Sequence, residues 1–296
     1  MTLDTRVAIV TGAGGGLGAS HAQLLSHRGA RVVVNDVHLE TARTVADLIN
    51  ARGGEAIAIG ASVTDEAGVA EMVETVMTRW GRIDILVNNA GILRDRSFAK
   101  MTLDDFRRVL DVHLMGAVVC TKAVWEIMRA QCYGRVVMTT SSSGLYGNFG
   151  QANYGAAKMA LVGLMQTLAI EGEKYGIRVN CLAPTAATEM THGVLAPEAL
   201  AVLTPDRVSP ALIALVQEDA PTRAILCAGG GHFAQANITL TNGLYIGEGP
   251  MVADILMNEW AAVGDRTNES IPAHGFMQAE RELISAGVVL SAAPQT

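Results

Sequence analysis

The sequence contains few charged and few aromatic residues, and this scarcity limits the kind of protein that it encodes. Of its 296 residues, 17% are charged and 4% are aromatic, whereas 50% are hydrophobic. This composition is typical of a packed globular protein and excludes an intrinsically disordered chain. The formal net charge is −7. Since no basic stripe is available to neutralise phosphates, we expect no nucleic acid partner.

Long hydrophobic runs are also missing, because Lys122 and Lys158 interrupt the longest apolar stretches. The sequence therefore predicts no membrane span and no membrane partner. The first ten residues, MTLDTRVAIV, carry an acidic residue and a strand-like run where a secretory signal has basic and apolar regions. The last residues, APQT, match no peroxisomal or retention signal. We expect a cytoplasmic protein.

Closely spaced cysteine pairs are absent as well. Cys120, Cys132, Cys181 and Cys227 lie far apart and form no CxxC motif. This spacing suggests neither a disulfide framework nor a zinc site. We expect reduced thiols and no bound metal.

Short apolar runs rich in Val and Ile alternate with amphipathic segments of helical length, such as Leu39–Ala51 and Asp65–Trp80. Strand followed by helix, repeated, predicts an α/β fold with a doubly wound (Rossmann) parallel sheet. Seven runs indicate seven strands: RVAIVT, ARVVVND, EAIAIGAS, IDILVNNAG, GRVVMTTS, IRVNCLAP and AILCAG.

The chain changes character after the seventh run. It continues with AGGGHF, a short strand-like run ANITL, and helical patterns over 250–263 and 276–286. We predict a single domain in which residues 1–231 form a dinucleotide-binding catalytic domain. Residues 232–296 are expected to form a C-terminal extension packed on the same domain.

Two helical segments, Val112–Met128 and Tyr154–Ile170, are apolar nearly all round. A helix of this kind must be buried on every face, and the sheet covers only one. A symmetric contact between copies of the chain would cover the other, which predicts a homodimer or homotetramer. The alternative is burial beneath the C-terminal extension.

The run TGAGGGLG, residues 11–18, lies between the first strand and a helical pattern. Gly12, Gly16 and Gly18 allow the backbone to turn tightly and approach a pyrophosphate at the helix N-terminus. Asp36 ends the second strand, where a carboxylate accepts hydrogen bonds from the adenine-side ribose. Because this carboxylate repels a 2′-phosphate and His38 is the only cationic candidate nearby, we predict NAD as cofactor rather than NADP. The alternative is that Asp36 is a solvated turn residue.

Tyr154 and Lys158 are four residues apart, which places a phenol and an ammonium on one helical face. A cation beside a phenol favours the phenolate, so we expect Lys158 to lower the pKa of Tyr154. Ser141 could hold the reacting oxygen against that phenol. By itself such a pair is most often an ordinary helix surface, but its position after a dinucleotide motif predicts a catalytic acid, a cation and an anchor for hydride transfer.

Taken together, these motifs resemble the short-chain dehydrogenase/reductase family over residues 5–231. Ser141, Tyr154 and Lys158 match its catalytic positions, and NNAG at 88–91 matches its fourth-strand motif. The resemblance implies a set of cofactor contacts: Gly12, Gly16, Leu17, Gly18, Asp36, Ser62, Val63, Asn89, Ala90, Gly91, Tyr154, Lys158, Pro184, Ala187 and Thr188.

More narrowly, VNNAGILRDRSFAK, YGRVVMTTSSSGLYGNFGQANY and LAIEGEKYGIRVN resemble the (3R)-hydroxyacyl-CoA dehydrogenase branch found in peroxisomal multifunctional enzymes of the second type and in bacterial relatives. This implies NAD-linked oxidation of a secondary alcohol, most simply a 3-hydroxyacyl-CoA. Two alternatives stay open. One is a hydroxysteroid or small secondary-alcohol dehydrogenase on the same machinery, and the other is a non-catalytic NAD-binding sensor.

Three positions depart from the common family pattern. His113 replaces an asparagine that completes a proton relay, although the branch shares this histidine. The ring either holds a water in a relay, and so counts among the catalytic residues, or is packed and satisfied locally. Ser62 replaces an aspartate after the third strand, so adenine recognition is either weaker there or relies on the Val63 backbone. Thr185 replaces a glycine in a segment that looks one residue short.

Residues around the predicted site suggest its substrate. Leu145, Tyr146, Phe149 and Met190 indicate an apolar pocket. Two arginines that follow NNAG have two interpretations, contact with a CoA phosphate or pairing with nearby acids such as Asp95; they are Arg94 and Arg96.

Overall fold

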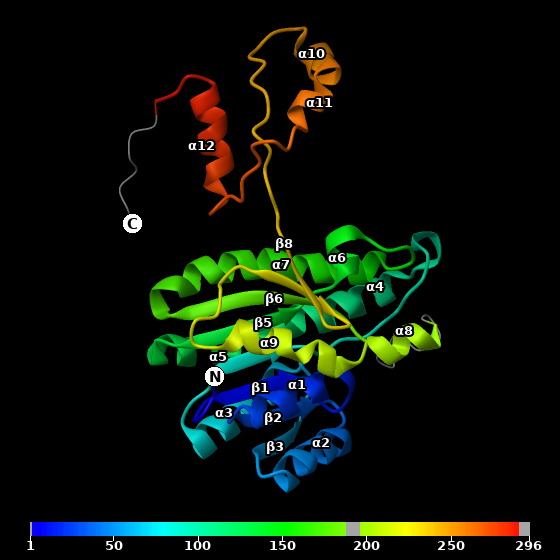
Figure 1. Ribbon diagram of the computed structural model, residues 1–296, viewed down its shortest axis with the longest axis vertical. Helices are drawn as coiled ribbons and strands as arrows, with labels where there is room; N and C mark the ends of the chain where they lie inside the picture. The colour runs from blue at the N-terminus through cyan, green and yellow to red at the C-terminus, as the bar shows by residue number, and fades with distance from the viewer. Residues whose placement is uncertain (1, 188–195, 290–296) are drawn as a thin grey trace. The chain divides into compact units, whose positions relative to one another are not determined.

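The computed structural model describes residues 2–187 and 196–289. The chain forms two compact units, Met1–Ala236 and Asn237–Thr296. One eight-stranded sheet runs through the first unit, in the order β3-β2-β1-β4-β5-β6-β7-β8 (Figure 1). The strands are β1 (Val7–Thr11), β2 (Arg31–Asp36), β3 (Glu55–Gly60), β4 (Ile85–Asn88), β5 (Gly134–Thr139), β6 (Ile177–Thr185), β7 (Ile225–Gly229) and β8 (His232–Ala236).

The predicted doubly wound parallel sheet is confirmed, with one strand more than expected. The seven predicted strands pair in parallel, whereas β8 pairs antiparallel with β7. The sequence did not reveal β8, because HFAQA is a short and mostly exposed edge strand without an apolar run. The compact unit therefore extends to Ala236, five residues past the predicted boundary at 231.

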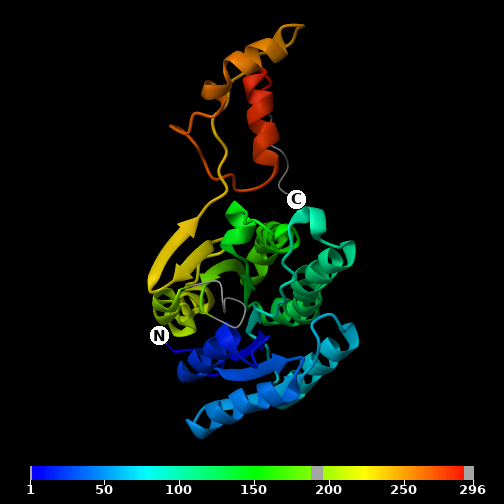
Figure 2. The same cartoon turned by 90° about the vertical axis from the view of Figure 1, so that its right-hand side faces the viewer.

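Helices cover both faces of the sheet (Figure 2). Strand side chains alternate between two hydrophobic clusters, so that Ala8 and Val10 face one and Val7 and Ile9 face the other. The first cluster is closed by α1 (Gly16–His27), α2 (Leu39–Ala51) and α9 (Ser209–Val216). The second is closed by α3 (Glu66–Trp80), α5 (Gly116–Gln131) and α7 (Ala152–Gly172).

This topology fixes where a ligand can bind. The strand order reverses between β1 and β4, and parallel α/β sheets bind ligands at the carboxyl ends of the strands beside such a reversal. Shorter elements complete the unit: α4 (Leu103–Leu110), a π-helical turn (Asp111–Met115), α6 (Ser142–Tyr146), α8 (Pro197–Val202), and 3₁₀ turns Phe98–Lys100, Glu173–Tyr175 and Pro205–Arg207.

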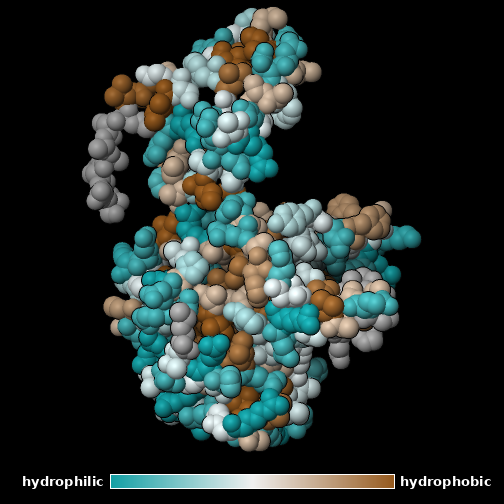
Figure 3. All heavy atoms as spheres, in the orientation of Figure 1, coloured by the Kyte–Doolittle hydropathy of each residue, from teal (hydrophilic) through white to brown (hydrophobic). Residues whose placement is uncertain are grey.

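Within residues 237–289 the second unit contains three short helices: α10 (Val252–Asn258), α11 (Trp260–Val263) and α12 (Phe276–Ser285). These agree with the helical patterns at 250–263 and 276–286. The run ANITL is not a regular strand, and Leu240 forms only an isolated bridge with Ser270. None of the residues 237–289 is buried, and large hydrophobic side chains are exposed on this unit (Figure 3). Packing of the extension on the catalytic domain stays a prediction.

Two general features concern the described ranges as a whole. No helix in residues 2–187 or 196–289 combines the length and apolar composition needed to cross a membrane. Over the same residues, no three His, Cys, Asp or Glu side chains gather into a group that could hold a metal ion.

Candidate functional site

The three predicted catalytic side chains lie together at the carboxyl end of β5. Ser141 follows that strand and caps α6, where its Oγ accepts a hydrogen bond from the Ser143 N–H at 3.2 Å. Tyr154 and Lys158 lie on α7, which packs against α6. The Ser141 hydroxyl lies close enough to the Tyr154 phenol to lower its pKa. The structure thus assembles a phenol and a hydroxyl that the sequence separates by thirteen residues.

Lys158 is buried, with only 3% of its surface exposed, and its ammonium donates a hydrogen bond to the Thr139 carbonyl at 2.5 Å. Its Nζ lies 5.4 Å from the centroid of the Tyr154 ring. Burial disfavours a charge, so the pKa of Lys158 falls to about 7. This lysine is therefore poised between its charged and neutral forms at neutral pH.

The predicted lowering of the tyrosine pKa is wrong for the chain by itself. Burial raises the pKa of Tyr154 above its ordinary value, the nearby Ser141 hydroxyl lowers it in part, and the charge of Asp95 raises it further. The ammonium of Lys158 is turned to a backbone carbonyl rather than to the phenol oxygen. At neutral pH the phenol is consequently protonated, which suits a proton donor.

His113 lies in the π-helical turn between α4 and α5, packed edge-on against the Tyr154 ring with 5.2 Å between the centroids. Burial and the nearby charge of Lys158 lower its pKa to about 3, so the ring is neutral. Its Nε2 lies 2.8 Å from the Ile92 carbonyl and 3.1 Å from the Ile92 N–H, so it either donates to the carbonyl or accepts from the N–H, depending on the tautomer. Nδ1 is buried and has no hydrogen-bond partner among the described residues.

A cavity of about 10 Å³ adjoins this ring and is also lined by Thr11, Asn88 and Lys158. Its size is that of about one water molecule. The amide of Asn88 donates to Thr121 at 3.0 Å, but its Oδ1 is buried without a partner, as is Nδ1 of His113. Both interpretations of His113 have support: the ring is bonded locally, and it borders a small cavity that Lys158 also lines. Its relay role stays a prediction.

The glycine loop shows why its residues are small. At Gly12, where φ is +62°, a Cβ would lie 2.7 Å from the Ala90 Cα, and at Gly18 it would lie 2.3 Å from the Gly12 carbonyl oxygen. Gly16 also has a positive φ, of 51°. At Gly15 there is open space, and no side chain caps the first turn of α1. Free backbone N–H groups beside open space fit a dinucleotide pyrophosphate.

Asp36 lies directly beside this loop. Its Oδ2 accepts a hydrogen bond from the Gly14 N–H at 3.0 Å, and its Oδ1 accepts one from the His38 N–H at 3.0 Å. Each carboxylate oxygen keeps a further lone pair for a ribose hydroxyl. Asp36 is therefore part of the loop architecture as well as a candidate ligand.

The NNAG segment braces the same loop. Thr11 accepts hydrogen bonds from the backbone N–H groups of Asn89 and Ala90, at 3.0 and 3.1 Å. The Asn89 amide donates to the carbonyls of Thr11 and Gly12. The Asn89 side chain thus holds the glycine loop in place. The sequence predicted it as a cofactor contact and did not reveal this structural role. Gly91 is needed because a Cβ there would lie 2.2 Å from the His113 ring.

The remaining predicted cofactor contacts surround these elements. Leu17 is buried in the first cluster, Val63 is buried in the second, and the Ser62 hydroxyl bonds to Thr64 at 2.9 Å. Pro184 lies in β6, and the Ala187 N–H donates to the Leu203 carbonyl. Thr188 and Met190 lie outside the described residues.

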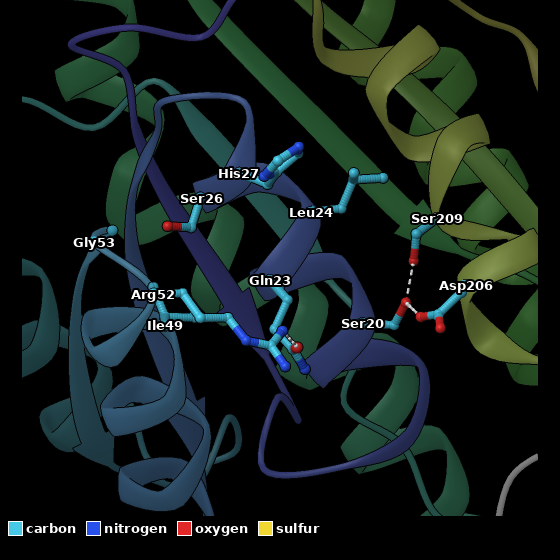
Figure 4. A pocket seen from close by; sticks show the side chains of 11 residues that line it. Ser20, Gln23, Leu24, Ser26, His27, Ile49, Arg52, Gly53, Asp206 and Ser209 are labelled. Carbon is cyan, nitrogen blue, oxygen red and sulfur yellow. Dashed lines mark hydrogen bonds between the residues drawn. The ribbon is translucent and has the colours of Figure 1, made fainter.

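A larger cavity, of about 460 Å³, lies along the outer side of α1 (Figure 4). The Ser20 hydroxyl there bonds to Asp206 at 2.8 Å and to Ser209 at 2.7 Å. None of the predicted catalytic or cofactor residues lines this cavity. These bonds tie α1 to the segment that leads into α9.

Comparison with known proteins agrees with this geometry. The short chain dehydrogenase family matches residues 6–199. The peroxisomal hydratase-dehydrogenase-epimerase of Saccharomyces cerevisiae is 42% identical over 277 residues, covering 90% of this chain and 31% of the yeast protein. This chain thus spans about a third of that relative.

Two solved structures are also similar. Full-length peroxisomal multifunctional enzyme type 2 from Drosophila melanogaster gives a TM-score of 0.82 at 36% identity, covering 97% of this chain and 50% of that one. A 7α-hydroxysteroid dehydrogenase complexed with NADH and 7-oxo glycochenodeoxycholic acid gives 0.73 at 30% identity, covering 78% of this chain and 95% of that one. This chain belongs to the short chain dehydrogenase family, and it is an oxidoreductase that acts on CH–OH groups.

Proposed function

We propose that the protein is an NAD-dependent dehydrogenase that interconverts a 3-hydroxyacyl-CoA and its 3-oxo form. The observation that carries this proposal is the placement of Ser141, Tyr154 and Lys158 together at the carboxyl edge of the sheet, with a fitting dinucleotide loop at the same edge. The likeness to the yeast and Drosophila multifunctional enzymes favours an acyl-CoA substrate.

The residues divide the chemistry between them. The nicotinamide, when bound, exchanges a hydride with the carbinol carbon. Ser141 holds the substrate oxygen, and Tyr154 gives it a proton in reduction or removes one in oxidation. Lys158 would bond the nicotinamide ribose, and the cavity beside His113 gives it a route to pass on a proton. Because the phenol pKa is raised, we expect oxidation to accelerate as the pH rises above neutral.

The preference for NAD rests on Asp36. Replacing Asp36 with Asn keeps an acceptor for the Gly14 N–H, loses the one for the His38 N–H, and removes the charge that repels a 2′-phosphate. A hydrogen bond to a charged group contributes about 1.5–3 kcal/mol. We therefore expect kcat/KM with NAD to fall about ten- to a hundredfold in D36N, while kcat/KM with NADP rises. Steady-state kinetics with both cofactors measures this, and an unchanged ratio would remove Asp36 from cofactor selection.

The rim of the site suits an acyl-CoA. Tyr146 and Phe149 are exposed at 72% and 90%, which offers apolar surface to an acyl chain. Asp95 bonds to Gln151 and not to the neighbouring arginines. Arg94 is 3.8 Å from Asp105. The exposed guanidinium of Arg94 is therefore held only by this long contact. The exposed guanidinium of Arg96 has no side-chain partner among the described residues. Both groups are available to a CoA phosphate.

A hydroxysteroid dehydrogenase is the second candidate, favoured by the likeness to the 7α-hydroxysteroid enzyme. A substrate panel separates the two. We expect NAD reduction with 3-hydroxyacyl-CoA to exceed that with the free hydroxy acid or a steroid alcohol, with NAD and NADP run side by side. A steroid alcohol as the better substrate would replace the acyl-CoA proposal while leaving the dehydrogenase chemistry intact. No turnover with any of them would favour a non-catalytic sensor, although the catalytic triplet is complete.

We also propose a cytoplasmic homo-oligomer. The buried side of α7 faces the sheet, while Met159 and Ile170 on the same helix are exposed at 40% and 46%. A second copy of the chain would cover this apolar side.

A further inference from the structure

The segment after the NNAG motif is tied to the start of α7 by three hydrogen bonds. Gln151 donates from Nε2 to the Asp95 carboxylate at 2.7 Å. Asn153, which is fully buried, donates to the Arg94 carbonyl at 3.0 Å. The Arg96 N–H donates to the Gly150 carbonyl at 2.9 Å. Two stretches separated by more than fifty residues in sequence are thereby held together beside the site.

Gln151 also connects this contact to the catalytic groups. Its Oε1 accepts hydrogen bonds from the Ser143 hydroxyl at 2.8 Å and from the Asn148 amide at 3.1 Å. The Ser143 N–H in turn bonds to the Oγ of Ser141. Both polar ends of one amide are therefore used, one toward Asp95 and one toward the segment of the catalytic serine.

Gln151 is also the N-cap residue of α7, the helix that carries Tyr154. Gln151 precedes the first residue of α7, and its carbonyl accepts from the Gly155 N–H at 2.7 Å. Two residues further on from Gln151, the side chain of Asn153 accepts a hydrogen bond from the Tyr154 N–H at 2.7 Å. Moving the Asp95 segment would therefore move both Ser141 and Tyr154.

We propose that Asp95 and Gln151 form a positioning bridge, in which Asp95 fixes the Gln151 amide so that Ser141 and Tyr154 keep the spacing needed to share the substrate oxygen. This inference rests on the proposed function, since it assumes that this serine and tyrosine act on substrate. Neither residue of the bridge touches the reacting atoms; each acts through the catalytic pair.

The bridge can be tested by exchanging its amide donor and its carboxylate acceptor between positions 95 and 151. In Gln151→Glu a carboxylate faces Asp95, so the contact is broken by repulsion. In the double variant Asp95→Asn with Gln151→Glu, the new amide donates to the new carboxylate, which still accepts from Ser143 and Asn148. Asp95→Asn alone keeps an acceptor for Gln151 and removes only the charge. Asp104→Asn, on an exposed side chain of α4, is the matched control for loss of a nearby carboxylate.

We expect Gln151→Glu to lower kcat about ten- to a hundredfold, because small displacements of reacting groups have effects of this size, while the KM for NAD stays unchanged. The double variant should regain most of the wild-type kcat. Asp104→Asn should match wild type throughout.

The pH profile gives a second readout that a purely structural role would not move. The groups around the Tyr154 phenol are Ser141, His113, Lys158 and Asp95, and only Asp95 adds a negative charge that raises the phenol pKa. Asp95→Asn should shift the pH at which oxidation is half-maximal to lower values.

Wild-type kcat in Gln151→Glu, or a double variant no better than Gln151→Glu, would overturn the bridge. An Asp95→Asn pH profile identical to that of Asp104→Asn would show that the Asp95 charge does not reach the phenol, and so would overturn the placement of the bridge beside the catalytic pair. Such results leave the proposed function standing as long as Tyr154→Phe is inactive in the same assay. Loss of the proposed function would appear instead as no turnover in the wild-type protein.

Discussion

Replacing Tyr154 with Phe is expected to lower turnover by about a hundred- to ten-thousandfold, the range typical of a positioned general acid or base. The substitution removes only the hydroxyl, and the ring stays packed against His113. NAD affinity should therefore survive. Stopped-flow measurement of NADH formation, together with calorimetric titration of NAD, measures both quantities.

Tyr175 provides the matched control for this experiment. It lies beyond the opposite end of α7, where its hydroxyl bonds to Arg129 at 2.6 Å. Tyr175→Phe should retain wild-type turnover. If Tyr154→Phe kept turnover within about threefold of wild type, the phenol would have no role as acid or base, since such a change is far below the expected range.

Lys158→Met is expected to have two opposite effects, a loss of activity and a gain of stability. Burial lowers the pKa of Lys158 from 10.5 to about 7, so at neutral pH the unfolded chain binds this proton more readily than the folded one. Removing the ammonium relieves that cost but leaves the Thr139 carbonyl without its donor. We expect a net gain of about 1–3 kcal/mol in the free energy of unfolding at pH 7.

The pH dependence makes the assignment specific. As pH rises from 7 toward 10.5, the folded lysine is neutral while the unfolded one stays charged, so wild-type stability should rise, by about 2 kcal/mol between pH 7 and 9 from this group. Lys158→Met should lack that rise, and its turnover should fall at least a hundredfold. Urea unfolding at the two pH values tests the account. A variant less stable than wild type at pH 7, with the same pH slope, would contradict it.

Much of the fold could be predicted because five of the parallel strands, β1, β2, β4, β5 and β6, are buried along most of their length. Such strands appear in the sequence as continuous Val- and Ile-rich runs. The glycine loop and Asp36 were recognisable because parallel strands bring their carboxyl ends to one edge, so residues after β1 and β2 must be neighbours. The edge strand β8 was missed because its side chains are exposed and leave no apolar pattern.

The chemistry of the site was harder to predict than its composition. Helical spacing correctly placed Tyr154 and Lys158 on α7. It could not show that the ammonium turns to the Thr139 carbonyl, or that burial would raise the tyrosine pKa. The bonds of Gln151 to Asp95 and of Asp36 to Gly14 also depend on tertiary packing. No local spacing in the sequence encodes such contacts.

Direct transfer of hydrogen from the substrate carbon to the cofactor is tested most plainly by isotope tracing. The protein would be mixed with NAD and a 3-hydroxyacyl-CoA deuterated at the carbinol carbon, and the reduced cofactor analysed by mass spectrometry. The account predicts one deuterium in each NADH formed and none released to water. Deuterium in the solvent, with unlabelled NADH, would contradict it.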